Sequence, residues 1–128
     1  MQLRSFMSAK IHKANVTRAN LNYVGSITID SALLEKTGLQ KNEKVLVVSN
    51  TTGVRLETYI IEGERDSGAV EVNGAAAHLI GEGEEIIIIA FALATEPFEP
   101  KAILVNEKNQ FVCFLDEKAG EDVHAYTN

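Results

Sequence analysis

The chain has 128 residues, enough for one domain with a buried core, and its 45% hydrophobic content argues against disorder. Its 18 acidic and 12 basic residues give a formal net charge of −6, so it lacks the basic surplus that nucleic-acid binding requires. The longest apolar run, 86–94, is too short to span a bilayer, and the N-terminus lacks a signal-peptide pattern. We therefore expect a single cytoplasmic domain over 1–128, with no membrane or nucleic-acid partner.

In chain order, the first predicted elements are a short helix and a β-hairpin. Asp30 is a suitable N-cap for a helix over 31–36, and Gly38 stands where that helix should end. Two strands follow over 44–48 and 54–61, rich in β-branched residues and separated by a turn-forming segment.

The second half of the chain predicts more strands. One helical turn is expected over 75–78, and the segment 86–91 is apolar on both faces, which predicts a strand buried on both sides. The segments 102–105 and 111–115 predict a second hairpin, and the polar end, about 117–128, is expected to be a disordered tail. Many short strands in one small domain favour a mainly β fold, a closed barrel with a few short helices.

The pair Gly25-Ser26 stands directly before a predicted strand, where such a pair is ordinarily just a turn. It is accompanied by further blocks whose content and spacing together resemble the aspartate 1-decarboxylase family over nearly the whole chain. The matching stretches are Lys10-Ile11-His12, Val16-Thr17, Tyr23-Val24-Gly25-Ser26, Arg55-Leu56-Glu57-Thr58-Tyr59 and Val72-Asn73-Gly74-Ala75-Ala76-Ala77-His78. The part after Pro97 matches more loosely.

The resemblance implies a double-psi β-barrel, assembled as a homotetramer with active sites between subunits. It also implies self-cleavage between Gly25 and Ser26, which yields the fragments 1–25 and 26–128. The Ser26 hydroxyl attacks the Gly25 carbonyl, and the resulting ester eliminates to leave a pyruvoyl group at position 26. This group forms a Schiff base with L-aspartate, which becomes β-alanine and CO₂, and β-alanine supplies pantothenate and coenzyme A synthesis. The family uses neither a metal nor pyridoxal phosphate; a maturation factor that assists cleavage stays an open alternative.

The resemblance also implies roles for individual side chains. Thr58 and Asn73 are candidates to polarise the Gly25 carbonyl during cleavage. Arg55 and Lys10 are expected to hold the side-chain carboxylate of aspartate, since a paired α-carboxylate would resist leaving as CO₂. Tyr59 is expected to donate a proton to the carbon that loses CO₂. Four residues are expected to contact the substrate: Thr58, Gly74, Ala75 and Ala76. Two more, Tyr23 and His12, are expected to form the site wall.

Three points stay open. Thr58 and Tyr59 are neighbours on a predicted strand and should face opposite sides, so both can serve an active site only if the strand is irregular or if sites lie between subunits. His12 is either a site-wall residue or a structural histidine with satisfied hydrogen bonds. Val48 stands where some family members have an aromatic residue near the site, which puts the shape of the pocket in question.

Two other functions remain as alternatives. The chain is a non-catalytic β-barrel binding module if Gly25-Ser26 is only a turn, and in that case it stays uncut. It is a pyruvoyl enzyme for another amino acid if it is cut but prefers a different substrate.

Overall fold

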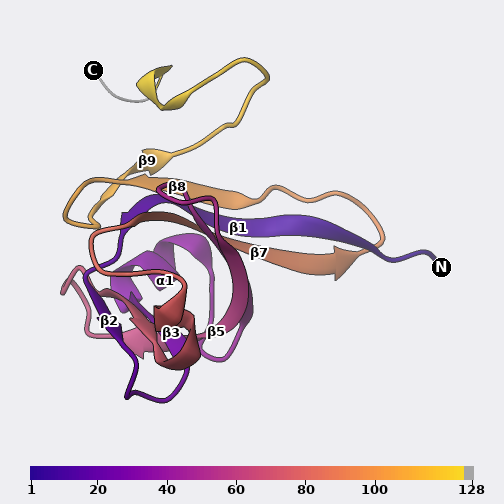
Figure 1. Cartoon of the computed structure of the whole chain (residues 1–128). Coiled ribbons are helices and arrows are strands. Elements are labelled where there is room, and N and C mark those ends of the chain that lie inside the picture. The colour runs from indigo at the N-terminus through magenta and orange to yellow at the C-terminus, as the bar shows by residue number, and fades with distance from the viewer. Residues whose placement is uncertain (126–128) are drawn as a thin grey trace.

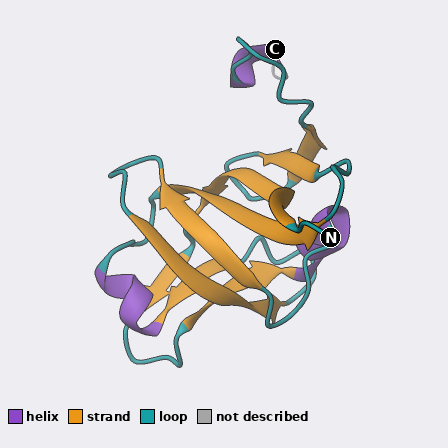
Figure 2. Cartoon of the chain, turned by 90° about the vertical axis from the view of Figure 1, so that its right-hand side faces the viewer, coloured by secondary structure: helices purple, strands orange, loops and turns teal. Residues whose placement is uncertain are grey.

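The computed structural model describes residues 1–125 and confirms a mainly β fold (Figure 1). Within these residues, nine strands form one sheet in the order β2-β6-β3-β5-β4-β7-β1-β8-β9. The sheet curls around a single core, and its strands cross one another at steep angles (Figure 2). The strands are β1 (Arg4–Asn15), β2 (Arg18–Asn20), β3 (Ser26–Asp30), β4 (Lys44–Ser49), β5 (Arg55–Gly63), β6 (Val70–Asn73), β7 (Glu85–Ala94), β8 (Lys101–Val105) and β9 (Phe111–Phe114).

The helical elements are short, as expected. Helix α1 (Ser31–Thr37) begins at the cap Asp30 and ends at Gly38, whose φ of 75° is the left-handed conformation that glycine tolerates best. The expected single turn after Asn73 is a 3-10 helix, η1 (Gly74–His78). A second 3-10 turn, η2 (Val123–Ala125), lies beyond the last strand.

Both predicted hairpins are confirmed. Strands β4 and β5 pair antiparallel with an unbroken register from Lys44↔Tyr59 to Val48↔Arg55, and β8 and β9 also pair antiparallel. Alternation sends Val45 and Val47 of β4 into the core, where they are about 1% exposed.

Strand β7 departs from its prediction. Ile86 and Ile88 are completely buried, whereas Ile87 and Ile89 on the opposite face are only half-buried. Leu46 and Val48 lie opposite these two residues on β4 and share that face. We call Leu46, Val48, Ile87 and Ile89 the outer apolar strip, since the described part of the chain covers it only partly.

The longest strand, β1, has no counterpart among the predicted elements. It pairs antiparallel with β7 and parallel with β8, and in Figure 1 its first residues run beside the end of β7 out to the N-terminus. Its buried positions are Ala9, Ile11 and Ala14, and the register with β7 shifts twice along the way. Small residues and bulges weaken the two-residue hydrophobic period by which a strand is recognised.

After β9 the chain leaves the sheet in both views (Figures 1 and 2). The disordered tail expected over about 117–128 stays a prediction, and its last three residues, 126–128, lie outside the described part. Among residues 1–125, no helix is long and apolar enough to cross a membrane.

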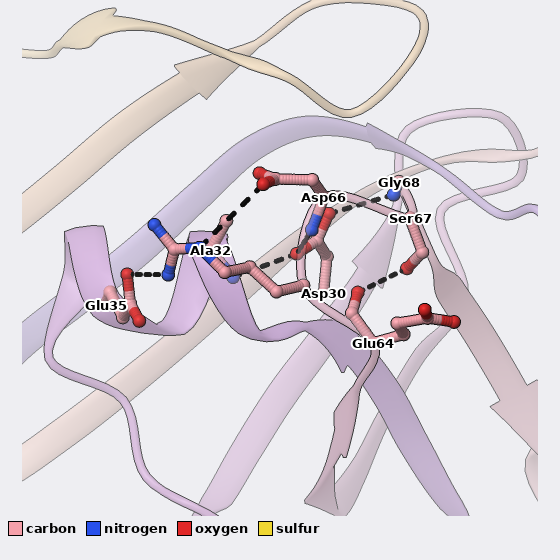
Figure 3. A network of polar contacts seen from close by, with 8 residues as sticks. Asp30, Ala32, Glu35, Glu64, Asp66, Ser67 and Gly68 are labelled. Atoms are coloured by element: carbon pink, nitrogen blue, oxygen red, sulfur yellow. Dashed lines mark hydrogen bonds and ion pairs between the residues drawn. The ribbon is translucent and has the colours of Figure 1, made fainter.

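The start of α1 is fixed by Asp30, a buried residue that is 3% exposed. One oxygen accepts from the backbone N–H groups of Ala32 at 2.8 Å and Asp66 at 2.9 Å, and the other accepts from Gly68 N–H at 2.8 Å (Figure 3). Because this carboxylate joins the end of β3 to the loop before β6, it holds together the two strands that carry Ser26 and Asn73.

Replacing Asp30 by Ala should lower the free energy of unfolding by about 3 kcal/mol, since three backbone donors lose a charged acceptor. Asp30→Asn should cost less, because its amide oxygen still accepts. Urea denaturation monitored by circular dichroism measures both, and Glu62→Gln, an exposed change on β5, is the control expected within about 0.5 kcal/mol of wild type. A wild-type midpoint for Asp30→Ala would contradict this account.

Candidate active site

Ser26 is the first residue of β3 and is 1% exposed. It lies directly opposite Asn73 on the antiparallel strand β6, so the two side chains project to the same side of the sheet. Asn73 Nδ2 donates a hydrogen bond to Ser26 Oγ at 3.0 Å and another to Thr28 Oγ1 at 3.0 Å. Ser26 Oγ in turn donates to the backbone oxygen of Val24 at 3.4 Å. The hydroxyl is therefore held on both sides, next to the Gly25 peptide.

Gly74 allows this segment to come close. Its φ is +67°, and a Cβ built on it would lie 2.6 Å from Gly25 Cα, 2.8 Å from Gly25 N and 3.0 Å from the carbonyl oxygen of Tyr23. Distances this short leave no room for any other residue. The Asn73-Gly74 turn thus lies against the chain just before Ser26, and its contact with substrate stays a prediction.

A cavity of about 500 Å³ opens beside Ser26. Most of its lining consists of residues that the sequence analysis assigns to the site, from β3, β5, β6 and η1. The lining residues are Gly25, Ser26, Leu56, Glu57, Thr58, Tyr59, Asn73, Ala75, Ala76 and Leu79. The structure thus brings together three separate sequence blocks around one buried hydroxyl, with hydroxyl and amide groups beside a carbonyl that it could attack.

Thr58 and Tyr59 face opposite sides of β5, as alternation predicts. The register with β4 is unbroken through both residues, which excludes an irregular strand here. Thr58 is half-buried and Tyr59 is 38% exposed, and both also line a second, shallow cavity with Lys44 and Glu57. Tyr59 therefore stands at the rim of the Ser26 cavity.

Arg55 and Lys10, the two residues expected to bind a carboxylate, lie outside the Ser26 cavity. Arg55 is exposed on β5, on the same face as Tyr59 and the outer apolar strip, with Val48 as its cross-strand neighbour. Lys10 is on β1, two strands beyond β4 in the sheet. It shares the outer face with its neighbour Ile89 on β7. Neither side chain lines the Ser26 cavity.

Lys10 Nζ is paired with the Glu117 carboxylate at 2.5 Å, which links β1 to the start of the segment after β9. Together with His12 and Leu115 these two residues line a cavity of about 190 Å³. Burial, followed by the positive charge of Lys10, lowers the pKa of His12, so its ring is neutral at pH 7. His12 Nδ1 is buried and has no hydrogen-bond partner among the described residues. This disfavours the interpretation of His12 as a structural histidine with satisfied hydrogen bonds.

Tyr23 contributes to the site through its backbone. Its carbonyl oxygen lies at Gly74, while the residue as a whole is 52% exposed in the loop between β2 and β3. Tyr23 does not line the Ser26 cavity, and its place at the site wall stays a prediction.

Thr28 is a polar residue of the site that the sequence analysis missed. It is two residues after Ser26 on β3, and on a strand that spacing places both side chains on one face. Alternation from Ser26 is the signal that could have identified it. Glu57, Leu56 and Leu79, which line the cavity, were missed for lack of any comparable signal. Among residues 1–125, no group of three or more His, Cys, Asp or Glu side chains could hold a metal ion.

Comparison with known proteins identifies the family to which this chain belongs. The family model described as aspartate decarboxylase matches residues 1–112. An aspartate 1-decarboxylase of Bacillus pumilus is 54% identical over 124 residues, covering 94% of this chain and 98% of the relative. One from Bacillus licheniformis is 50% identical over 123 residues, covering 93% and 94%, and one from Bacillus cereus is 52% identical over 122 residues, covering 91% and 96%. The chain therefore belongs to the aspartate decarboxylase family.

Proposed function

We propose that this chain cleaves itself between Gly25 and Ser26 and then, with a pyruvoyl group at position 26, converts L-aspartate to β-alanine and CO₂. The β-alanine would serve pantothenate and coenzyme A synthesis. The observation that carries the proposal is the buried Ser26 hydroxyl, held by the Asn73 amide beside the Gly25 peptide in an open cavity. Family membership supports the same reaction.

Cleavage begins with attack of Ser26 Oγ on the carbonyl carbon of Gly25. The C–N bond breaks, its nitrogen becomes the free amine of Ser26, and an ester links the two residues. Loss of the Ser26 α-proton then expels the Gly25 carboxylate and leaves a double bond between Cα and Cβ. Addition of water and loss of ammonia complete the ketone. Intramolecular attack in a fixed geometry is favoured by up to about 7–11 kcal/mol over a bimolecular encounter.

The residues around Ser26 fit these steps. The Asn73 N–H that reaches Ser26 Oγ can stabilise the negative charge that builds on this oxygen as its proton leaves. Gly74 gives the Gly25 segment the room to sit against η1. Thr58 lines the same cavity and supplies a hydroxyl that can donate to the Gly25 carbonyl oxygen.

A pyruvoyl group at position 26 supplies a ketone that takes the α-amino group of aspartate and accepts the electron pair left by CO₂. The chain's own residues then bind and protonate. Arg55 and Lys10 hold the side-chain carboxylate of aspartate, and the Tyr59 phenol donates a proton to the carbon that has lost CO₂.

The separation between the residues that line the Ser26 cavity and those expected to bind the substrate carboxylate implies more than one copy of the chain. Ser26, Thr58, Tyr59 and Asn73 line the cavity, whereas Lys10 and Arg55 lie outside it. The outer face also carries the half-buried outer apolar strip, which a second copy could cover. We therefore include in the proposal a homotetramer whose active sites lie between subunits.

Replacing Ser26 by Ala should leave a folded chain that is never cut and makes no β-alanine, because the nucleophile is gone. Intact mass should show wild type as two polypeptides, 1–25 and 26–128, and the variant as one. Assays with aspartate and glutamate side by side separate this proposal from a pyruvoyl enzyme for another amino acid. An uncut wild-type chain, or β-alanine made by Ser26→Ala, would contradict it.

Gly74→Ala should slow cleavage by on the order of a hundredfold, because its Cβ displaces the Gly25 backbone and a shift of about 1 Å is enough to disrupt attack. Gly53→Ala is the matched control: its φ is +82°, yet a Cβ there meets no atom within 4 Å. Both changes carry the same backbone cost of about 1–2 kcal/mol, so their difference isolates the contact with Gly25. Equal cleavage rates for the two variants would disprove the role of Gly74.

Glu117→Gln should lower KM for aspartate about two- to fivefold with little change in kcat. The Glu117 carboxylate is paired with Lys10, where the substrate carboxylate is proposed to bind. A partly exposed ion pair of this kind is worth up to about 1 kcal/mol. Steady-state kinetics measures the effect, with Glu107→Gln on the exposed β8–β9 turn as the control. An unchanged KM would show that the substrate does not compete with Glu117 for Lys10.

A further inference from the structure

Thr28 is joined to the Ser26 nucleophile through one shared side chain. Asn73 Nδ2 carries two hydrogens, and it donates to Ser26 Oγ and to Thr28 Oγ1 at 3.0 Å each. Thr28 itself does not line the cavity beside Ser26, so any effect it has on that site passes through Asn73.

The Thr28 side chain is held in the orientation that this contact needs. Its methyl carbon, Cγ2, lies against Gly63 on the parallel neighbour β5, where a Cβ would come within 3.1 Å of it. A threonine side chain has few accessible rotamers because it is branched at Cβ. In this rotamer the methyl group lies beside Gly63 and the hydroxyl accepts from Asn73.

We propose that Thr28 is a positioning residue for self-cleavage: its hydroxyl fixes the Asn73 amide so that the other N–H of that amide stays directed at Ser26 Oγ. The inference rests on the proposed function, since it concerns the same cleavage at Gly25-Ser26.

The chemistry explains why this second hydrogen bond matters. The last torsion of an asparagine side chain has a broad, shallow energy profile, so an amide held by one hydrogen bond swings easily. Thr28 supplies the second hydrogen bond and thereby fixes the amide plane. Ser26 Oγ then keeps one lone pair for Asn73 and one for attack on the Gly25 carbonyl, while its own proton is directed at Val24 O. The fixed N–H stabilises the charge that develops on Oγ as that proton leaves.

Thr28→Val tests the hydroxyl alone, because valine keeps the shape and the branching of threonine. We expect self-cleavage to slow about tenfold, because the Asn73 amide loses one of the two hydrogen bonds that orient it. Thr28→Ser restores the hydroxyl and should cleave within about threefold of wild type. The measurement is a time course of intact mass on newly synthesised, folded chain.

Two further variants separate positioning from simple loss of stability. Thr37→Val removes a buried hydroxyl whose hydrogen bond runs to Leu33 O in α1, far along the chain from the cavity, and should cleave at the wild-type rate. In an Asn73→Ala background, Thr28→Val should produce no additional slowing, since residues that act through one another are not additive.

The proposal is overturned if Thr28→Val cleaves like wild type, if Thr28→Ser is as slow as Thr28→Val, or if Thr28→Val slows the Asn73→Ala chain by a further tenfold. Failure of the proposed function itself is distinct, because wild type would then stay uncut in the same time course.

Discussion

The hydrogen bond between the Asn73 amide and the Ser26 hydroxyl is the interaction on which the site depends. It forms because β3 and β6 pair in a register that sets the two residues directly opposite each other. A slip of one residue would turn Ser26 toward the opposite face of the sheet and away from Asn73. The register is fixed on one side by Ile27, Ile29, Val70 and Val72, which are all buried in the core, and at the end of β3 by Asp30.

The curled sheet divides the site chemistry between two surfaces. The nucleophile, its amide partner, Thr58 and Tyr59 line the cavity, while Arg55 on β5 and Lys10 on β1 lie outside it. Under the proposed function, a chain that cleaves itself alone would still depend on a second copy to bring Arg55 and Lys10 to the substrate. This would separate the requirements for maturation from those for turnover.

Much of this arrangement could be predicted from local signals in the sequence. The Asp30 cap, the Gly38 end of α1 and the two hairpins follow from residue preferences that act over a few positions. The blocks around Ser26, Thr58 and Asn73 indicated a common site because their spacing resembles a known family. Thr28 could also have been predicted, since strand alternation places its side chain on the same face as that of Ser26.

The remainder depends on contacts between distant segments. Strand β1 was missed because Ala9, Ala14 and two register shifts blur its period, and its pairing partners lie far along the chain. The pairing of Lys10 with Glu117 joins residues 107 positions apart, and no local sequence pattern indicates that these two residues meet. The partial exposure of the outer face of β7 could not be predicted from its sequence either, because both faces of the strand are apolar.

The most direct test of the account is intact-mass analysis of purified protein incubated with aspartate and borohydride. If Ser26 becomes a ketone, reduction should attach substrate-derived mass to the 26–128 fragment and leave the 1–25 fragment unchanged. Active protein that stays in one uncut piece and gains no such mass would contradict the account.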